Sequence, residues 1–306
     1  MPDCRYRVRR WLIALQEKPM VAMTKARLDV VPLSKHIGAE IRGLDLHDKP
    51  DDEAIKAIYQ AWLDHLVIVF PDQKLEQEDL VRVTGYFGEM GMPRRPPQFF
   101  PKGYSRLLPG IMLISNIREN GEPIGALPDG EMMFHHDMIH SEVPDKATML
   151  YSVEIPGTGG NTLFASGYAA YDTLDPAVRN KLSGRKAIHH YNYGSTQKGD
   201  RKGTEAFGEC IHPVFRTNED TNRKAVYVNR LMTVGIVDMP KEESDPLLKA
   251  VFDHAERKEF VYEHVWRVGE LLLWDNRCSS HARTDFPSTQ RRLMWRTTVK
   301  GARRPY

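Results

Sequence analysis

Cysteine is scarce in this chain of 306 residues, which contains only Cys4, Cys210 and Cys278. Three cysteines do not make an even disulfide set, and none belongs to a Cys-x-x-Cys pair. A disulfide framework is therefore not expected. Cysteines used in this way are typical of a reducing compartment, so we expect a cytoplasmic protein.

Long apolar runs are also missing. No segment approaches the ~20 consecutive apolar residues that cross a bilayer, so no membrane partner is expected. The arginine-rich residues 5–10 followed by Trp11–Leu15 superficially look like a signal peptide, but Gln16–Pro19 interrupts the short apolar stretch and no small-residue cleavage site follows. We interpret residues 1–27 as a disordered or peripheral extension and residues 28–306 as a single domain.

Charge of one sign is not in excess either. Lysine and arginine number 43 against 41 aspartates and glutamates, which gives a formal net charge of +2 at pH 7, and no long block of like charge occurs. Nucleic acid is therefore not an expected partner. Hydrophobic residues make up 41% of the chain, which is enough for the core of an ordinary globular protein.

Short extended segments are what the chain has in number. Apolar runs predict strands at residues 66–70, 149–155, 162–165, 225–228, 260–266, 271–274 and 293–299. Helical spacing and capping residues predict helices after Asp51 or Asp52, over residues 76–87 and 176–182, and after Ser244. Five prolines within residues 93–109 predict an ordered loop or lid. Many short strands with few helices favour a β-sandwich or closed roll over an alternating βαβ sheet.

Histidine is the residue type that first suggests chemistry. His135 and Asp137 form a His-x-Asp pair, which in an extended segment lies on one face and can hold one metal ion. The pair alone is a weak signal, because twelve histidines make such spacings common by chance. His140 and His254, each two residues before a glutamate, are interpreted as ordinary surface or core histidines.

A second motif near the end of the chain strengthens the metal hypothesis. Trp274–Arg277 closes an apolar strand before His281, and Arg292 and Arg296 follow. Two histidines and one carboxylate form the facial triad of non-haem Fe(II) oxygenases, which leaves positions open for a chelating cosubstrate and dioxygen. Arginines on the following strand can bind the remote carboxylate of such a cosubstrate, and their even spacing turns both the same way.

With these motifs the sequence resembles the taurine dioxygenase and 2,4-dichlorophenoxyacetate dioxygenase group of Fe(II)- and 2-oxoglutarate-dependent oxygenases. The resemblance runs from about Leu28 to Gly301. Four segments carry it, in the order in which the group has them: Phe134–Asp137, Pro156–Leu163, Trp274–Arg277 with His281, and Arg291–Arg296. The resemblance implies a mainly β fold with helical additions, the double-stranded β-helix or jelly roll, which agrees with the strand-rich pattern.

The resemblance also implies roles for individual residues. The residues matched to catalytic iron ligands are His135, Asp137 and His281. Thr162 and Arg292 match the pair that holds the distal carboxylate of 2-oxoglutarate. Arg296 matches a second arginine that serves either the cosubstrate or an anionic group of the substrate. His136 is expected to point away from the metal.

The activity so implied is hydroxylation of a small organic substrate with Fe(II), dioxygen and 2-oxoglutarate, with release of succinate and carbon dioxide. Arg296, together with Arg94 and Arg95 in the proline-rich segment, favours an anionic substrate such as a sulfonate, a sulfate ester or an aryloxyalkanoate. Taurine itself is not favoured, because Glu131 replaces an asparagine that helps to hold taurine in taurine dioxygenase. The group commonly forms homodimers or tetramers, so a homo-oligomer is expected.

Other functions stay open at this point. A zinc hydrolase can use two histidines and an aspartate, but it needs a positioned general base, and the chain has no His-Glu-x-x-His helix. A non-catalytic jelly-roll binding module is expected to lack one of the ligands or the arginine, and this chain has them all. A regulatory or sensor use of the same site is a further alternative.

Overall fold

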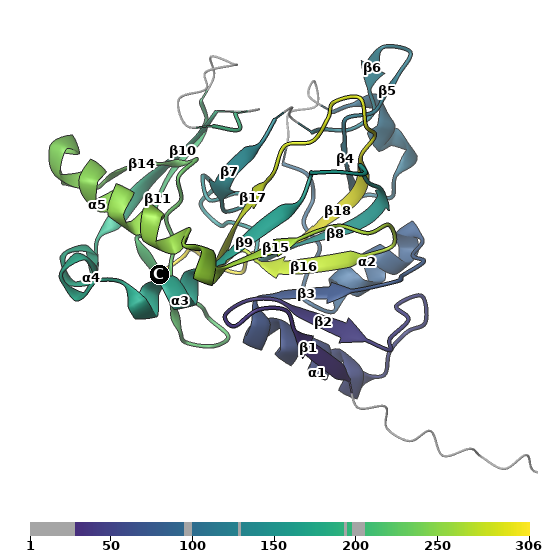
Figure 1. Ribbon diagram of the computed structural model, residues 1–306, viewed down its shortest axis with the longest axis horizontal. Helices are drawn as coiled ribbons and strands as arrows, with labels where there is room; N and C mark the ends of the chain where they lie inside the picture. Colours follow the sequence, from purple (N-terminus) through teal and green to yellow (C-terminus); the bar gives the residue numbers. More distant parts are fainter. Residues whose placement is uncertain (1–27, 95–99, 128–129, 193–194, 198–205) are drawn as a thin grey trace, which may run out of the picture.

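Two β-sheets that face each other form the centre of the protein (Figure 1). The computed structural model describes residues 28–94, 100–127, 130–192, 195–197 and 206–306, so the predicted extension over residues 1–27 lies outside the described residues. The larger sheet has the strand order β1-β2-β3-β16-β8-β18-β4 and the smaller one β15-β9-β17-β7. This arrangement confirms the predicted jelly roll with helical additions.

The strands pair antiparallel, apart from the parallel neighbours β2 and β3. The larger sheet consists of β1 (Asp29–Pro32), β2 (Ala39–Arg42), β3 (Val67–Phe70), β16 (Leu271–Asp275), β8 (Ala147–Glu154), β18 (Leu293–Val299) and β4 (Met112–Ser115). The smaller sheet consists of β15 (Val261–His264), β9 (Thr162–Ser166), β17 (Ser279–Arg283) and β7 (Met132–His135). The remaining strands are β5 (Arg118–Glu119), β6 (Glu122–Pro123), β10 (Lys186–Asn192), β11 (Ala206–Pro213), β12 (Phe215–Thr217), β13 (Lys224–Val226) and β14 (Thr233–Ile236).

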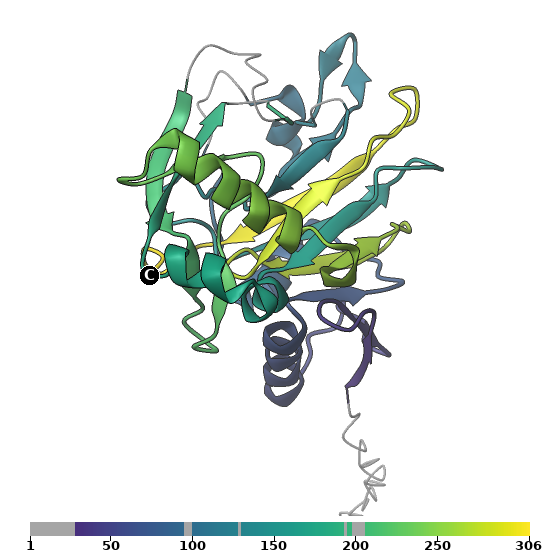
Figure 2. The same cartoon turned by 60° about the vertical axis from the view of Figure 1, so that its left-hand side comes forward.

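Helices cover the sheets on two sides (Figures 1 and 2). The α-helices are α1 (Asp52–His65), α2 (Gln77–Gly85), α3 (Gly167–Thr173), α4 (Pro176–Leu182) and α5 (Lys241–Ala255), and the short 3₁₀ helices are η2 (Lys102–Arg106) and η3 (Lys258–Phe260). Helices α3, α4 and α5 gather beside the three-stranded sheet of β11, β10 and β14, whereas α1 lies near β1, β2 and β3. No described helix has the length and apolar character needed to cross a membrane.

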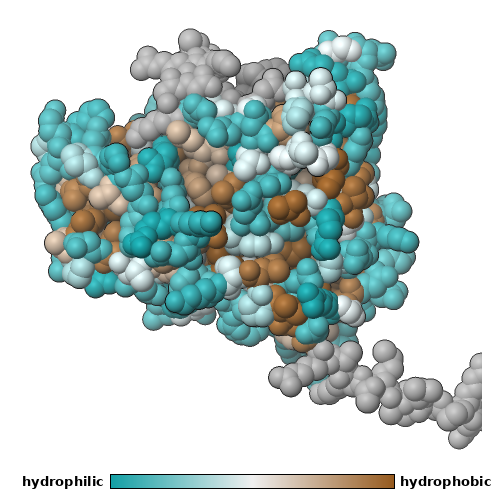
Figure 3. All heavy atoms as spheres, in the orientation of Figure 1, coloured by the Kyte–Doolittle hydropathy of each residue, from teal (hydrophilic) through white to brown (hydrophobic). Residues whose placement is uncertain are grey.

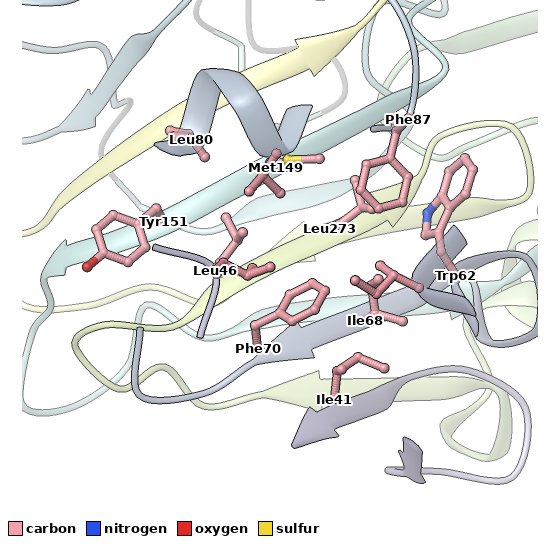
Figure 4. Close-up of a cluster of buried hydrophobic side chains, with 14 of the residues drawn as sticks. Ile41, Leu46, Trp62, Ile68, Phe70, Leu80, Phe87, Met149, Tyr151 and Leu273 are labelled. Atoms are coloured by element: carbon pink, nitrogen blue, oxygen red, sulfur yellow. The ribbon is translucent and has the colours of Figure 1, made fainter. Parts of the chain in front are cut away.

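The core on the outer face of the larger sheet is built by α1 and α2 (Figure 4). Asp51 caps α1 as predicted, since its carboxylate accepts a hydrogen bond from the backbone N–H of Ala54. Trp62 from α1 and Leu80 from α2 then pack against sheet residues such as Leu273. Helices α1 and α2 thus cover one face of the larger sheet, and the smaller sheet packs on its other face.

The second core lies between the two sheets. Leu272, Trp274 and Met294 from the larger sheet pack with Phe164 of β9 in one buried cluster. Hydrophilic residues cover most of the outer face seen in Figure 3, with apolar side chains between them. The apolar filling between the sheets therefore holds β9 and β17 in fixed register above β16.

Some elements differ from their sequence-based predictions. Ser244 does not cap α5: the helix begins at Lys241, and the backbone N–H groups of Glu243 and Ser244 already bond to the carbonyl of Pro240. Ser244 is instead a buried residue of the first turn. The described part of the proline-rich segment contains the 3₁₀ helix η2 and is otherwise irregular.

Candidate metal centre and cosubstrate pocket

His135, Asp137 and His281 come together at the end of the smaller sheet. Strands β7 and β17 lie side by side (Figure 1). His281 on β17 is paired directly with His135 on β7, and their ring centroids lie 4.0 Å apart. One possible ligand atom from each of the three residues lies within 4.8 Å of the others, and all three side chains are buried. In the described parts of the chain no other group of three or more histidine, cysteine or acidic residues has this geometry.

Asp137 reaches this group in a different way from the one predicted. Strand β7 ends at His135, and Asp137 lies in the turn that follows, where Met138 adopts a φ of 56°. The prediction that His135 and Asp137 share one face of an extended segment is therefore wrong, although the two side chains do meet. An ion pair and a hydrogen bond, and not strand alternation, orient the carboxylate.

The carboxylate of Asp137 is held by one of its two oxygens. Its Oδ2 forms an ion pair with Arg296 Nη2 at 2.7 Å and accepts a hydrogen bond from Thr148 Oγ1 at 2.7 Å. Burial by itself raises the pKa of Asp137, but Arg296 and the two histidines outweigh burial and keep that pKa below its usual range. The carboxylate is therefore ionised, and its other oxygen, Oδ1, can bind a metal ion. Oδ1 lies 4.0 Å from His281 Nε2.

A chain of hydrogen bonds from the Trp-Asp-Asn-Arg motif fixes Thr148. Trp274 Nε1 donates to Asn276 Oδ1 at 2.8 Å, and Asn276 Nδ2 donates to Thr148 Oγ1 at 2.9 Å. Thr148 can then donate its hydroxyl proton only onward, to Asp137. Sequence reasoning missed Thr148, which carries no local signal, and recognised Asn276 only as part of a matched motif.

The histidines are in the state that a metal ion needs. His135 Nδ1 lies 2.9 Å from the carbonyl oxygen of Met133, so the tautomer that donates there leaves the lone pair on Nε2. Burial lowers the pKa of both His135 and His281, which keeps them neutral. Two neutral imidazoles and one carboxylate suit a divalent ion such as Fe(II) and leave part of its coordination sphere open. His136 is not in this group, and its Nδ1 lies 3.2 Å from Asn229 Nδ2.

A cavity of about 550 Å³ adjoins the three residues. The predicted site residues Thr162, Arg292 and Arg296 all line it, as does Arg94. Arg95 lies outside the described residues. His140 also lines the cavity, so its interpretation as an ordinary surface or core histidine missed this position. Every described residue that the sequence nominated for the site therefore lines this cavity.

Arg292 and Thr162 lie in the part of this cavity that suits a carboxylate. Arg292 is only 2% exposed, and its Nε has no hydrogen-bond partner among the described residues. Burial lowers its pKa to about 9, and the neighbouring Arg283 contributes to the same shift. Thr162 Oγ1 accepts a hydrogen bond from Trp266 Nε1 at 3.0 Å, so its own proton is available to a further acceptor. A buried guanidinium beside a hydroxyl donor is suited to bind an anion.

Comparison with known proteins identifies the class of enzyme that has this site. The profile of the "Taurine catabolism dioxygenase TauD, TfdA family" matches residues 29–298. The chain belongs to this family. Its activity is accordingly that of an Fe(II)- and 2-oxoglutarate-dependent dioxygenase, as the sequence predicted. The alternatives of a zinc hydrolase and of a non-catalytic binding module find no support in the comparisons.

Individual relatives of this dioxygenase cover almost its whole length. It is 29% identical over 283 residues to the (S)-phenoxypropionate/alpha-ketoglutarate-dioxygenase of Sphingobium herbicidovorans, covering 89% of this chain and 95% of that one. It is 28% identical over 281 residues to the alpha-ketoglutarate-dependent 2,4-dichlorophenoxyacetate dioxygenase of Cupriavidus pinatubonensis, covering 88% and 96%. A solved structure of a putative alpha-ketoglutarate-dependent taurine dioxygenase from Burkholderia xenovorans matches with a TM-score of 0.75 and 30% identity, covering 90% and 93%.

Proposed function

We propose that His135, Asp137 and His281 are the residues by which this dioxygenase holds Fe(II). The proposal depends on the two carboxylate oxygens of Asp137 having different partners. Arg296 and Thr148 contact Oδ2, whereas Oδ1 lies near His281 Nε2. When Fe(II) is bound, it supplies oxidative decarboxylation of 2-oxoglutarate and hydroxylation of a substrate carbon with dioxygen. The protein residues fix the ligand geometry and keep the site buried.

Thr162 and Arg292 are the proposed partners of the distal carboxylate of 2-oxoglutarate. Arg292 offers a planar fork of N–H donors and Thr162 a hydroxyl proton, while the indole of Trp266 occupies the lone pair of that hydroxyl. Their burial makes the attraction for an anion stronger than it is in water. When 2-oxoglutarate is bound, these two residues would hold its distal carboxylate at the cavity wall.

Arg296 has two proposed tasks. Its Nη2 holds Asp137, whereas its Nε is buried without a hydrogen-bond partner among the described residues. The side chain is 21% exposed and lines the cavity. We assign this remaining donor capacity to an anionic group of the substrate or to the cosubstrate.

The substrate that we propose is a small anion with an apolar body, of the aryloxyalkanoate type in the first place. Two relatives are named for phenoxypropionate and 2,4-dichlorophenoxyacetate. The cavity wall is rich in methionine: Met92, Met112, Met132, Met138 and Met232. Thioethers adapt to irregular apolar shapes and make favourable contacts with aromatic rings. Sulfonates and sulfate esters are the next candidates, and Glu131 argues against taurine itself.

Stepwise loading of the protein without oxygen tests this function. Purified protein is titrated anaerobically with Fe(II) and then with 2-oxoglutarate, and the weak visible charge-transfer band of the chelated iron is recorded. Aryloxyalkanoates, sulfate esters and sulfonates are then added singly, and succinate formation is measured after oxygen is admitted. We expect the band to appear with 2-oxoglutarate and to shift with an aryloxyalkanoate. Folded, iron-loaded protein without the band would contradict the proposed cosubstrate site.

Removing residues 1–22 tests the proposed division of the chain. We propose that residues 28–306 contain the whole catalytic unit, because the family profile starts at residue 29. The truncated protein is expected to keep full turnover with its best substrate, measured as succinate release beside the full-length protein. A large loss of activity would mean that the first residues contribute to the site or to folding.

We propose a cytoplasmic homo-oligomer, a dimer or a tetramer, that does not act on nucleic acid. Cys278 is buried and Cys210 partly buried, and both are free thiols, which is compatible with a reducing compartment. Light scattering coupled to gel filtration measures the oligomeric state directly.

A further inference from the structure

Arg283 lines the cavity and has no role in the proposed function described above. It is the last residue of β17, two positions after His281, so both side chains point to the same face of the strand. Both residues line the cavity. Arg283 therefore faces the cavity from the same strand as the metal ligand His281, at the next position on that face.

The strand register places Arg283 beside Thr162. The two residues are directly paired across β17 and β9, and residues so paired have their Cβ atoms roughly 4.5–5.5 Å apart on one face of the sheet. Thr162 is the proposed hydroxyl partner of the cosubstrate's distal carboxylate. A guanidinium that starts from the neighbouring strand position can reach the same anion.

The charges around Arg292 lead to the same place. Arg283 is 8% exposed and Arg292 is 2% exposed, and Arg283 is the charged neighbour that acts on the pKa of Arg292. Two buried like charges disfavour each other, and an anion between them removes that penalty. One end of Arg283 is anchored, because its Nη2 donates to the carbonyl oxygen of Gly130. This contact fixes the plane of the guanidinium at the cavity wall.

We propose that Arg283 is a second guanidinium for the distal carboxylate of 2-oxoglutarate, acting together with Arg292 and Thr162. The inference rests on the proposed function, because it concerns the same cosubstrate site. It predicts that this dioxygenase distinguishes a dicarboxylate from a monocarboxylate more strongly than one arginine allows.

A pair of ligands that differ only in the distal carboxylate tests the proposal. Metal-loaded wild type and Arg283→Met are titrated by calorimetry, without oxygen, with 2-oxoglutarate and with 2-oxopentanoate, which lacks that carboxylate. We expect Arg283→Met to weaken 2-oxoglutarate binding by about 10-fold, as the loss of one charged hydrogen-bond partner does, and to leave 2-oxopentanoate binding unchanged. Arg283→Lys should recover part of the loss, because it restores the charge without the planar fork.

Controls separate this role from a structural one. Arg118→Met removes another arginine that lines the cavity and that donates to a backbone carbonyl, that of Gly121, and it should leave 2-oxoglutarate binding within about twofold. If Arg283→Met weakens the binding of 2-oxoglutarate and of 2-oxopentanoate equally, Arg283 supports the backbone at Gly130 and does not bind the distal carboxylate. If the binding of both ligands is unchanged, Arg283 has neither role. Either result overturns the inference. Failure of the wild type itself to bind 2-oxoglutarate would instead refute the proposed function.

Discussion

His281→Ala is expected to abolish turnover and to weaken metal binding by about 100-fold or more. His281 supplies one of only three ligand atoms in the group, and substitutions one shell further out already cost roughly 10–100-fold in metal affinity. The measurement is anaerobic Fe(II) binding, with Mn(II) as a redox-stable substitute, followed by succinate release with the best substrate. His281 is paired directly with His135, so a loss of metal binding in His281→Ala is explained by the missing ligand itself.

Two further variants make this result interpretable. His140→Ala removes a histidine that lines the same cavity but lies outside the ligand group, so it should retain metal binding. Asp137→Asn keeps the size of the side chain and removes its charge, so it should fold normally and lose metal affinity. It tests the metal site independently if His281→Ala folds poorly. Melting curves recorded without metal report on folding. Normal metal affinity in a folded His281→Ala protein would exclude His281 as a ligand.

Elements with strong local signals could be predicted from the sequence. Helix α4 was predicted over residues 176–182, where Asp175 caps the first turn and proline occupies its start. Strand β18 was predicted over residues 293–299 from its apolar and β-branched residues. Such elements need no knowledge of their neighbours, because caps and periodicity act within a few residues.

Strand β17, which carries His281 and Arg283, was not predicted as a strand. Strand β17 has the sequence Ser-Ser-His-Ala-Arg, in which polar residues face the cavity at the positions where an ordinary buried strand has apolar ones. Functional selection has thus replaced the alternation by which strands are recognised. His281 was nominated by its place after the apolar strand that Trp274–Arg277 closes and by the resemblance to a known family, and not by a strand pattern of its own.

The hydrogen bonds and strand pairings that support the site from distant parts of the chain could not be predicted. Thr148 and Asn276 are 128 positions apart, yet their hydrogen bond orients Asp137. Arg283 and Thr162 become neighbours only through the register of β17 and β9. A sequence does not show which residues pair across a sheet, so the supporting residues of the site emerge only from the folded structure.

Arg292→Met is expected to weaken 2-oxoglutarate binding by about 100-fold while leaving the fold intact. Hydrogen bonds to charged partners contribute roughly 1.5–3 kcal/mol each, and a bidentate pair is lost here. Binding of 2-oxopentanoate should change little, because that ligand has no distal carboxylate. Calorimetric titration of metal-loaded protein without oxygen measures both affinities.

The neighbouring arginine provides the matched control. Arg291 is exposed and forms a surface ion pair with Glu154 at 2.6 Å, so Arg291→Met should alter neither cosubstrate affinity nor stability by more than about 1 kcal/mol. An equal loss of 2-oxoglutarate binding in both variants would point to a general effect of charge and would contradict the assignment of Arg292.

Stability gives an independent readout of the same residue. Burial lowers the pKa of Arg292 to about 9 from its ordinary value, and Arg283 adds to this effect, so the folded protein disfavours the charged side chain that it nevertheless retains at neutral pH. Arg292→Met should therefore melt at or above the temperature of the wild type when no ligand is present, and it should lose the stabilisation that 2-oxoglutarate gives to the metal-loaded wild type. A protein that keeps a buried cation at a cost to its own folding does so because an anion binds there. If ligand-free Arg292→Met melted far below the wild type, Arg292 would instead be needed for the stability of the fold.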